Sequence, residues 1–254
     1  MKLHHERLGS GSPLVILHGL LGSGDNWQGL AKGWAQDFDM LIPDLRNHGR
    51  SPHAEEAGFA AMATDVIELM DEAGLAQVIV LGHSLGGKVA MRLAMDFPER
   101  VKGLIVVDIA PKAYPPAHQA LLEALLAVDL SRFTTRSEVE TVLAGSIPEP
   151  AIRQWLLKNL GRDAAGALCW KPNLPVLHKC LMELSAGFAD LRQYRGPALF
   201  VAGGKSNYVQ PEDTPLIQAR FPQARLEVIP EAGHWVHVEA PGKLVEMVRQ
   251  FAGQ

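Results

Sequence analysis

The chain has 254 residues, of which 47% are apolar, 20% charged and 6% aromatic. This composition excludes a disordered chain, a collagen and a disulfide-rich scaffold, and the length is sufficient for one large hydrophobic core. The net charge of −4, from 24 Lys and Arg against 28 Asp and Glu, argues against a general nucleic-acid binder.

Short apolar runs that recur along the chain predict strands. They are apolar on both faces and several end at Gly or Asp, which is typical of parallel strands covered by helices on both sides. The predicted strands are residues 14–17, 40–42, 78–81, 104–107, 199–201 and 226–229.

Between these strands, apolar residues recur at every third or fourth position, which predicts helices. One helix carries this pattern from Phe59 to Ala73 and ends at Gly74, a second precedes Pro98, and a third begins at Pro241. Strands and helices in alternation predict an α/β fold with a doubly wound, mostly parallel sheet.

The stretch from about 111 to 191 breaks this alternation. It shows helical patterns around 121–126, 139–143, 152–160 and 177–184, and no convincing buried strand. Prolines divide these short helices from one another. We therefore predict a core formed by residues 1–110 and 191–254, with a helical cap, residues 111–190, inserted over the sheet.

The sequence shows no targeting or membrane-spanning segment. Residues 1–9 lack the apolar region of a signal peptide, and the longest apolar runs are far too short to span a bilayer. We therefore expect a cytoplasmic protein with no membrane association. Its two cysteines, Cys169 and Cys180, are expected to stay reduced.

The segment Gly82-His83-Ser84-Leu85-Gly86 stands between a predicted strand and a predicted helix. A G-x-S-x-G sequence in this context is typical of a nucleophile elbow, a tight turn that exposes a reactive serine. The glycines are needed because the turn is strained and leaves no room for neighbouring side chains. We predict Ser84 as the nucleophile. A glycine-rich turn without a catalytic role is the alternative.

Backbone N–H groups beside Ser84 form the predicted oxyanion hole. The first N–H groups of a helix are unpaired and can stabilise developing negative charge. Leu85 follows Ser84 at the start of the predicted helix, so its N–H is predicted to be one donor. The second donor is assigned to the N–H of Leu20, in the loop His18-Gly19-Leu20-Leu21-Gly22 after the first predicted strand. His18 is expected to brace this loop, and an ordinary strand-to-helix turn is the alternative.

The predicted general base is His234, in the segment Gly233-His234-Trp235 after the last predicted strand. A histidine on a loop at the carboxyl end of a parallel strand can reach the elbow. The order of Ser84 before His234 along the chain also agrees with such a triad. His237, three residues later, is the less favoured candidate.

Four segments in combination resemble the α/β-hydrolase superfamily. They are His18-Gly19, Asp44-Leu-Arg-Asn-His-Gly-Arg-Ser51, Gly82 to Gly86, and Gly233-His234, and the resemblance covers residues 1–110 and 190–254. Two further segments, Val106-Val-Asp-Ile-Ala-Pro111 and Arg153-Gln-Trp-Leu-Leu-Lys-Asn-Leu160, are similar to YbfF-type bacterial esterases and their mitochondrial relatives. The resemblance implies an α/β-hydrolase fold, a serine esterase activity and a structural role for the loop 44–51.

The chain departs from the superfamily at the triad acid. Most members carry an Asp on the loop after the strand predicted at 199–201, but Asn207 stands there. An amide cannot stabilise an imidazolium ion as a carboxylate does. The strand 104–107 is expected to lie next to the elbow strand, so Asp108 at its end can approach the histidine, and the YbfF-type branch is similar in placing its acid there. Two alternatives stay open, an acid at Glu212 or Asp213 and a chain without a triad acid.

The predicted reaction is acyl transfer from an ester, or from a thioester, to water through an acyl-enzyme on Ser84. Eight Lys and Arg against eight Asp and Glu in residues 111–190 give no support for a phosphate-rich ligand, although the resembling branch includes thioesterases. No metal-binding spacing occurs. We expect a small-molecule substrate, no cofactor, no metal, no nucleic-acid partner, and a monomer or homodimer.

Two side-chain predictions concern the surroundings of the site. Lys88 is expected to be a solvated helix residue, and a position close to the site is the alternative. The cap aromatics are expected to form mostly cap core, with one or two lining an apolar acyl pocket. These aromatics are Tyr114, Phe133, Trp155, Trp170 and Phe188.

Two other classes of function compete with the esterase. One is different chemistry on the same fold, a cofactor-free haloperoxidase, a C–C hydrolase or a lyase, because a fold does not determine a reaction. The other is a small-ligand-binding protein without catalysis. Asn207 weakly favours the second, whereas intact Ser84 and His234 argue against it.

Overall fold

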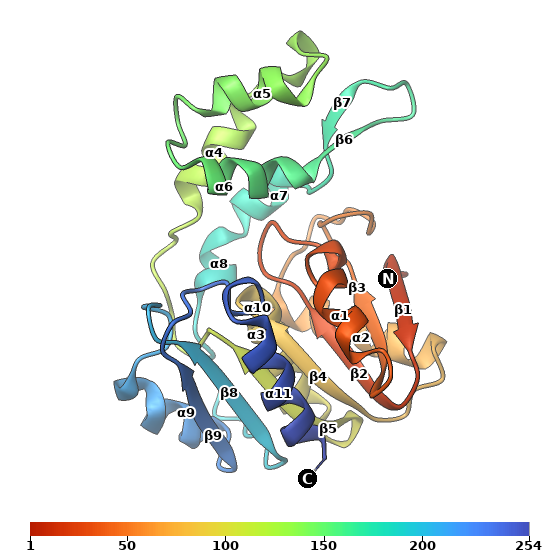
Figure 1. Cartoon of the computed structure of the whole chain (residues 1–254), viewed down its shortest axis with the longest axis vertical. Helices are drawn as coiled ribbons and strands as arrows, with labels where there is room; N and C mark the ends of the chain where they lie inside the picture. The colour runs from red at the N-terminus through yellow and green to blue at the C-terminus, as the bar shows by residue number, and fades with distance from the viewer. Residues whose placement is uncertain (254) are drawn as a thin grey trace.

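A computed structural model describes residues 1–253 of the protein. At its centre lies a seven-stranded sheet with the strand order β1-β3-β2-β4-β5-β8-β9 (Figure 1). β1 pairs with β3 in antiparallel fashion, and the other pairs are parallel. The strands are β1 (His5–Gly9), β2 (Ser12–Leu17), β3 (Phe38–Pro43), β4 (Val78–His83), β5 (Val101–Val107), β8 (Ala198–Gly203) and β9 (Ala224–Ile229).

The predicted doubly wound, mostly parallel sheet is thus confirmed, and each predicted strand is present with slightly wider bounds. β1 was not predicted. It lies at the sheet edge and carries the half-buried polar residues His5 and Glu6, so it lacks the apolar pattern that marks the interior strands.

Helices cover both faces of the sheet. α1 (Gln28–Trp34) and α11 (Pro241–Ala252) pack on one face, and α2 (Phe59–Glu72), α3 (Leu85–Asp96) and α9 (Thr214–Arg220) pack on the other. Successive side chains of β4 alternate between these two layers, because neighbouring residues of a strand point to opposite faces. The remaining short helices are η1 (Gly24–Asn26), η2 (Pro98–Arg100), η5 (Pro211–Asp213) and α10 (Val236–Glu239).

Between β5 and β8 the chain leaves the sheet and forms a separate layer above the carboxyl ends of the strands (Figure 1). We propose that residues 111–190 are the extent of this cap. A short hairpin of β6 and β7 was not predicted, because its three-residue strands are only partly buried. The cap elements are α4 (Gln119–Leu126), η3 (Leu130–Arg132), α5 (Arg136–Leu143), α6 (Pro150–Leu156), η4 (Leu157–Asn159), β6 (Leu160–Arg162), β7 (Leu168–Trp170), α7 (Leu174–Lys179) and α8 (Leu181–Ser185).

The polar loop at residues 44–51 is held by its own hydrogen bonds, in agreement with the structural role expected for it. The buried carboxylate of Asp44 accepts hydrogen bonds from the N–H groups of Gly24, at 2.7 Å, and Arg50, at 2.8 Å. Asn47 in this loop accepts, at its carbonyl oxygen, the N–H of the cap residue Asn173 at 2.9 Å. The loop therefore also anchors the cap.

The prediction that Lys88 is solvated is wrong. Its side chain is 1% exposed, and its Nζ donates hydrogen bonds to the carbonyl oxygens of Lys112 and Ala186. These two residues lie on the segments that lead into the cap and out of it. Burial lowers the pKa of Lys88 to about 7, while the two carbonyls and the nearby faces of aromatic rings favour the ammonium form. Lys88 thus ties both ends of the cap to α3.

We expect Lys88→Met to lower the free energy of unfolding by about 2 kcal/mol or more, because two buried carbonyls lose their donor. Urea denaturation at pH 8 measures this change. Lys102→Met, at an exposed position of β5, is the matched control and is expected to stay within about 0.5 kcal/mol of wild type. Equal stability of the two variants would contradict the structural role of Lys88.

Candidate active site

Ser84 lies in the sharp turn between β4 and α3, with a φ of 52° and a ψ of −116°. Its N–H donates to the carbonyl oxygen of Val107 on the neighbouring strand at 3.1 Å. A Cβ atom added to Gly82 would lie 2.1 Å from the carbonyl oxygen of Gly86, and one added to Gly86 would lie 2.4 Å from that of Leu17. The strained conformation of the serine therefore requires glycine at both flanking positions.

Asp108 comes directly after β5 and is fully buried. Its Oδ2 and the Nδ1 of His234 form a hydrogen bond of 2.7 Å. The same carboxylate accepts hydrogen bonds from the N–H of Gly203, at 2.9 Å to Oδ1, and from the hydroxyl of Ser206 to Oδ2. The structure thus brings together Asp108 and His234, which the sequence analysis selected as acid and base.

The alternative positions for an acid lie elsewhere. Asn207 is exposed, and Glu212 is exposed as well. Asp213 is engaged by the Lys112 ammonium at 2.6 Å and accepts the N–H of Gln210. Among residues 1–253, Asp108 is the one carboxylate that is hydrogen-bonded to His234.

Two further contacts fix the position of His234. Its carbonyl oxygen accepts a hydrogen bond from Nε2 of His83 at 2.9 Å, and burial keeps the pKa of His83 well below its usual value. The ring of Tyr208 stacks on the imidazole of His234, with ring centroids 4.0 Å apart. The hydroxyl of Tyr114 holds Tyr208 in turn, because it donates to the Tyr208 carbonyl oxygen at 2.6 Å.

The sequence analysis missed Ser206 and Tyr208. Both follow β8 on the loop that was searched for an acid, and their side chains contact Asp108 and His234. The available signal was their position after the strand 199–201, at the carboxyl edge where the site forms. A hydroxyl and an aromatic ring at such a position can support a triad without belonging to it.

The loop after β2 is braced by His18, as predicted. Nδ1 of His18 donates to the carbonyl oxygen of Gly19 at 2.8 Å, and Nε2 accepts the N–H of Leu45 at 2.9 Å. Burial lowers the pKa of His18, so the neutral ring keeps these two roles. Within residues 1–253, no protein acceptor receives the N–H of Leu20 or that of Leu85. Both N–H groups are thus free to donate a hydrogen bond to a ligand atom near Ser84.

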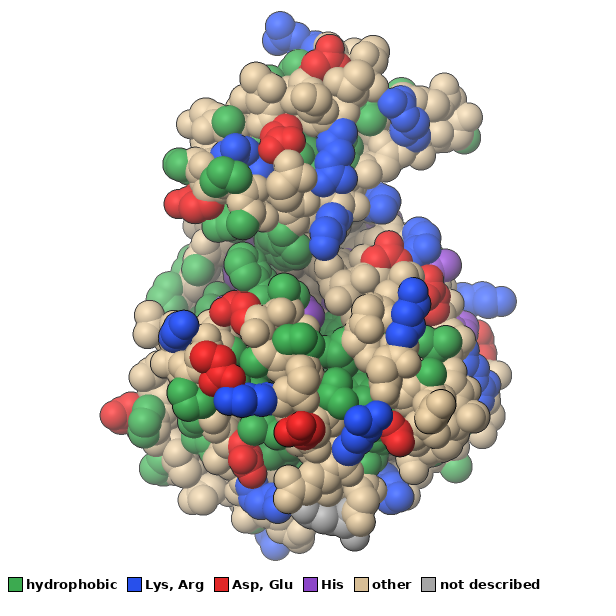
Figure 2. All heavy atoms as spheres, viewed as in Figure 1, with side chains coloured by type: hydrophobic (Ala, Val, Ile, Leu, Met, Phe, Trp, Pro, Cys, Tyr) green, Lys and Arg blue, Asp and Glu red, His purple; other side chains and the backbone are tan. Residues whose placement is uncertain are grey.

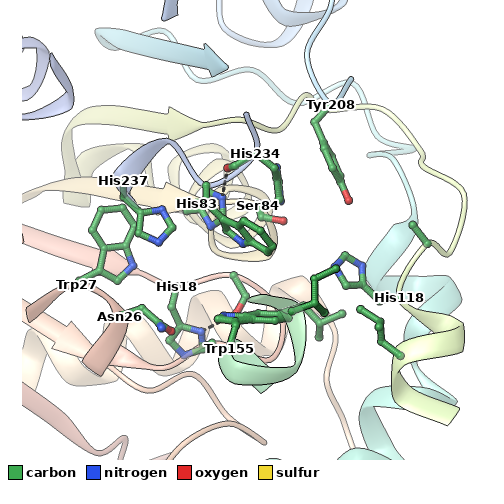
Figure 3. A pocket seen from close by; sticks show the side chains of 17 residues that line it. His18, Asn26, Trp27, His83, Ser84, His118, Trp155, Tyr208, His234 and His237 are labelled. Atoms are coloured by element: carbon green, nitrogen blue, oxygen red, sulfur yellow. Dashed lines mark hydrogen bonds between the residues drawn. The ribbon is translucent and has the colours of Figure 1, made fainter. Parts of the chain in front are cut away.

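Ser84 and His234 face a cavity of about 230 Å³ under the cap (Figure 3). Figure 2 shows hydrophobic side chains gathered in the hollow where the cap meets the sheet domain. Trp155 reaches the cavity from the cap, as expected for one of the cap aromatics. His237 stacks on Trp27, with centroids 4.6 Å apart, and burial lowers its pKa to about 4. It has no contact with the acid.

Three further features of the structure concern metal ligands, the cysteines and the lengths of the helices. No group of His, Cys, Asp and Glu side chains within residues 1–253 is arranged to hold a metal ion. Cys169 and Cys180 are free thiols. None of the helices in this range is both long and apolar enough to cross a lipid bilayer.

Comparisons with known proteins agree on one family. A family model described as the alpha/beta hydrolase fold matches residues 12–165 and 176–241. The sn-1-specific diacylglycerol lipase ABHD11 of Mus musculus is 38% identical over 246 residues, which cover 94% of this chain and 80% of that protein. Esterase YbfF of Escherichia coli (strain K12) is 35% identical over 241 residues, which cover 94% and 92%. The solved structure of a marine microorganism esterase has a TM-score of 0.96 and 39% identity, and the match covers 99% of both chains.

Proposed function

Because the chain belongs to the α/β-hydrolase family, we propose that it hydrolyses carboxylic esters through an acyl-enzyme on Ser84, with His234 as base and Asp108 as acid. The observation that carries the proposal is the 2.7 Å hydrogen bond between His234 and the buried carboxylate of Asp108, beside the strained Ser84. The esterase class of the enzyme agrees with relatives that are named as esterase and lipase.

In the first half of the reaction, Oγ of Ser84 attacks the acyl carbon while Nε2 of His234 takes the hydroxyl proton. The N–H groups of Leu20 and Leu85 hold the oxyanion that forms. The bond between the acyl carbon and the leaving oxygen then breaks, and that oxygen takes the proton from His234. Asp108 accepts a hydrogen bond from the Nδ1–H of His234 throughout. It therefore selects the tautomer whose Nε2 is unprotonated, and it stabilises the imidazolium.

In the second half, a water molecule attacks the acyl carbon of the acyl-enzyme. His234 takes one proton from the water, the bond to Oγ of Ser84 breaks, and Ser84 recovers its proton. The products are a carboxylic acid and an alcohol. A thioester follows the same steps with a thiol as leaving group, and we retain thioesters as substrates.

The first test measures hydrolysis of p-nitrophenyl esters from acetate to decanoate, with mass spectrometry of acid-quenched samples. We expect turnover above the buffer rate and a single acylated peptide that contains Ser84. Heat-unfolded protein is the control and is expected to show neither. Absence of both turnover and acylation in the folded protein would overturn the proposal and favour the ligand-binding or other-chemistry alternatives.

The cytoplasmic location, the monomeric or homodimeric state and the absence of nucleic-acid and membrane partners remain predictions from the sequence. The small-molecule ester substrate agrees with the named activities of the relatives.

A further inference from the structure

Two cavities meet at Ser84, and they differ in size and in wall chemistry. One holds about 230 Å³ and the other about 40 Å³. Both are lined by Ser84, Leu20, His118 and Tyr208. A substrate whose reacting carbon sits at Ser84 can therefore extend into each cavity, one with its acyl chain and the other with its leaving group.

The position of the proposed base decides which group enters which cavity. His234 lines the larger cavity and is absent from the wall of the smaller one. The leaving oxygen must lie within hydrogen-bond reach of His234 to receive its proton. The leaving group therefore occupies the larger cavity, and the acyl chain occupies the smaller cavity beside Leu85.

The smaller cavity limits the length of the acyl chain. It holds about 40 Å³ against about 230 Å³ for the larger cavity, so an acyl chain has much less room there than a leaving group has in the larger one. Its walls are mostly apolar, with Ile109, Leu181 and Leu184 among them. Lys88 also lines it, and its Nζ is held by two carbonyl oxygens, so this wall cannot be displaced without breaking buried hydrogen bonds.

The larger cavity suits a bulky leaving group with both apolar and polar surface. Trp27, Trp155 and Trp235 provide flat apolar walls. His118 reaches in from the cap, and no hydrogen bond joins its imidazole to another group of residues 1–253 (Figure 3). Burial lowers the pKa of this imidazole to about 4. Its neutral ring is a donor and an acceptor for a polar atom of the ligand.

We propose that the preferred substrates are esters of short acyl groups, such as acetyl or butyryl, with bulky ring-bearing alcohols. This inference rests on the proposed function, because it uses the roles of Ser84 and His234. It adds an acyl subsite in the smaller cavity and a leaving-group subsite in the larger one. A lipase acting on long-chain acyl esters would need a larger acyl cavity than leaving-group cavity.

The test uses two ester series, with rates normalised to hydroxide-catalysed hydrolysis. In the first, p-nitrophenyl esters run from acetate to decanoate. In the second, butyrate esters carry ethanol, benzyl alcohol or naphthylmethanol. We expect kcat/KM to fall at least about 10-fold from butyrate to octanoate and to rise at least about 10-fold from ethanol to naphthylmethanol. A preference for decanoate, or hydrolysis of dispersed long-chain diacylglycerol at the butyrate rate, would overturn the proposal.

Matched variants assign the cavities separately. Leu181→Ala enlarges the smaller cavity and is expected to raise the octanoate-to-butyrate ratio at least about 10-fold, with the order of alcohols unchanged. Ile152→Ala, in the larger cavity, is expected to change the order of alcohols and leave the acyl ratio unchanged. Leu181→Phe fills the smaller cavity, keeps a large apolar group in the core, and is expected to favour acetate over butyrate.

The outcomes separate this inference from the proposed function. If Leu181→Ala changes the order of alcohols and Ile152→Ala changes the octanoate-to-butyrate ratio, the acyl chain and the leaving group occupy the opposite cavities. Ser84 would still become acylated in that case. Absence of Ser84 acylation with every ester would instead reject the proposed function itself.

Discussion

Ser84→Ala is expected to lower kcat for p-nitrophenyl butyrate about 10⁶-fold, the loss typical of removing the nucleophile from a serine hydrolase triad. The loss is this large because Oγ of Ser84 forms the covalent bond, and without it His234 has no hydroxyl proton to take. Stopped-flow or long-time spectrophotometry measures kcat, and mass spectrometry is expected to show no acyl adduct. The small Ala side chain fits the turn, so the thermal midpoint should change little.

Ser206→Ala provides the matched control for a lost serine hydroxyl in the same site. Ser206 donates to Asp108 and does not form a bond to substrate in the proposed mechanism. Loss of one hydrogen bond to a charged group corresponds to about 10-fold in rate. Residual turnover of Ser84→Ala within 100-fold of wild type would mean that another group is the nucleophile.

Asp108→Asn is expected to lower kcat about 10⁴-fold. With Oδ1 still accepting from Gly203, the amide nitrogen takes the place of Oδ2 and faces Nδ1 of His234. An amide N–H cannot accept a hydrogen bond from Nδ1–H, so the imidazole shifts to the tautomer whose Nε2 carries the proton and cannot act as base. The same ester assay measures the change, and a circular dichroism spectrum checks the fold.

Asp213→Asn is the control for this prediction, since Asp213 was, with Glu212, one of the two rival acids in the sequence. It removes a negative charge that faces Lys112, away from His234, and is expected to change kcat less than about 3-fold. A large loss of kcat in Asp213→Asn together with a small loss in Asp108→Asn would mean that the triad acid lies on the loop after β8.

The parts of the site that the sequence predicted are those defined by short motifs. Ser84 lies in a five-residue turn whose glycines are required by backbone contacts within a few ångströms, so the local sequence carries the geometry. The His18 brace also joins neighbouring residues of one loop. Asp108 followed from the expected position of its strand beside the elbow strand, which the pairing of β4 with β5 bears out, together with the resemblance.

Contacts that join distant segments were not predictable in this way. Lys88 stands in a helix whose apolar pattern marks the side facing the sheet, and the pattern does not reveal that the cap covers the other side. Tyr208 and Ser206 reach the site only because β8 lies beside β5. β1 was missed because an edge strand needs no apolar alternation, and its pairing with β3 is a tertiary contact.

The convergence of both cap connections on Lys88 has a consequence for the evolution of this chain. The polypeptide leaves the sheet domain near Lys112 and returns near Ala186, and a single side chain binds both crossing points. An insertion whose ends meet behaves as a closed loop, and its length adds little to the entropy of closing it. Caps of other sizes could therefore be exchanged at this junction while the sheet below keeps its arrangement. The range of substrates could then change while the catalytic residues stay the same.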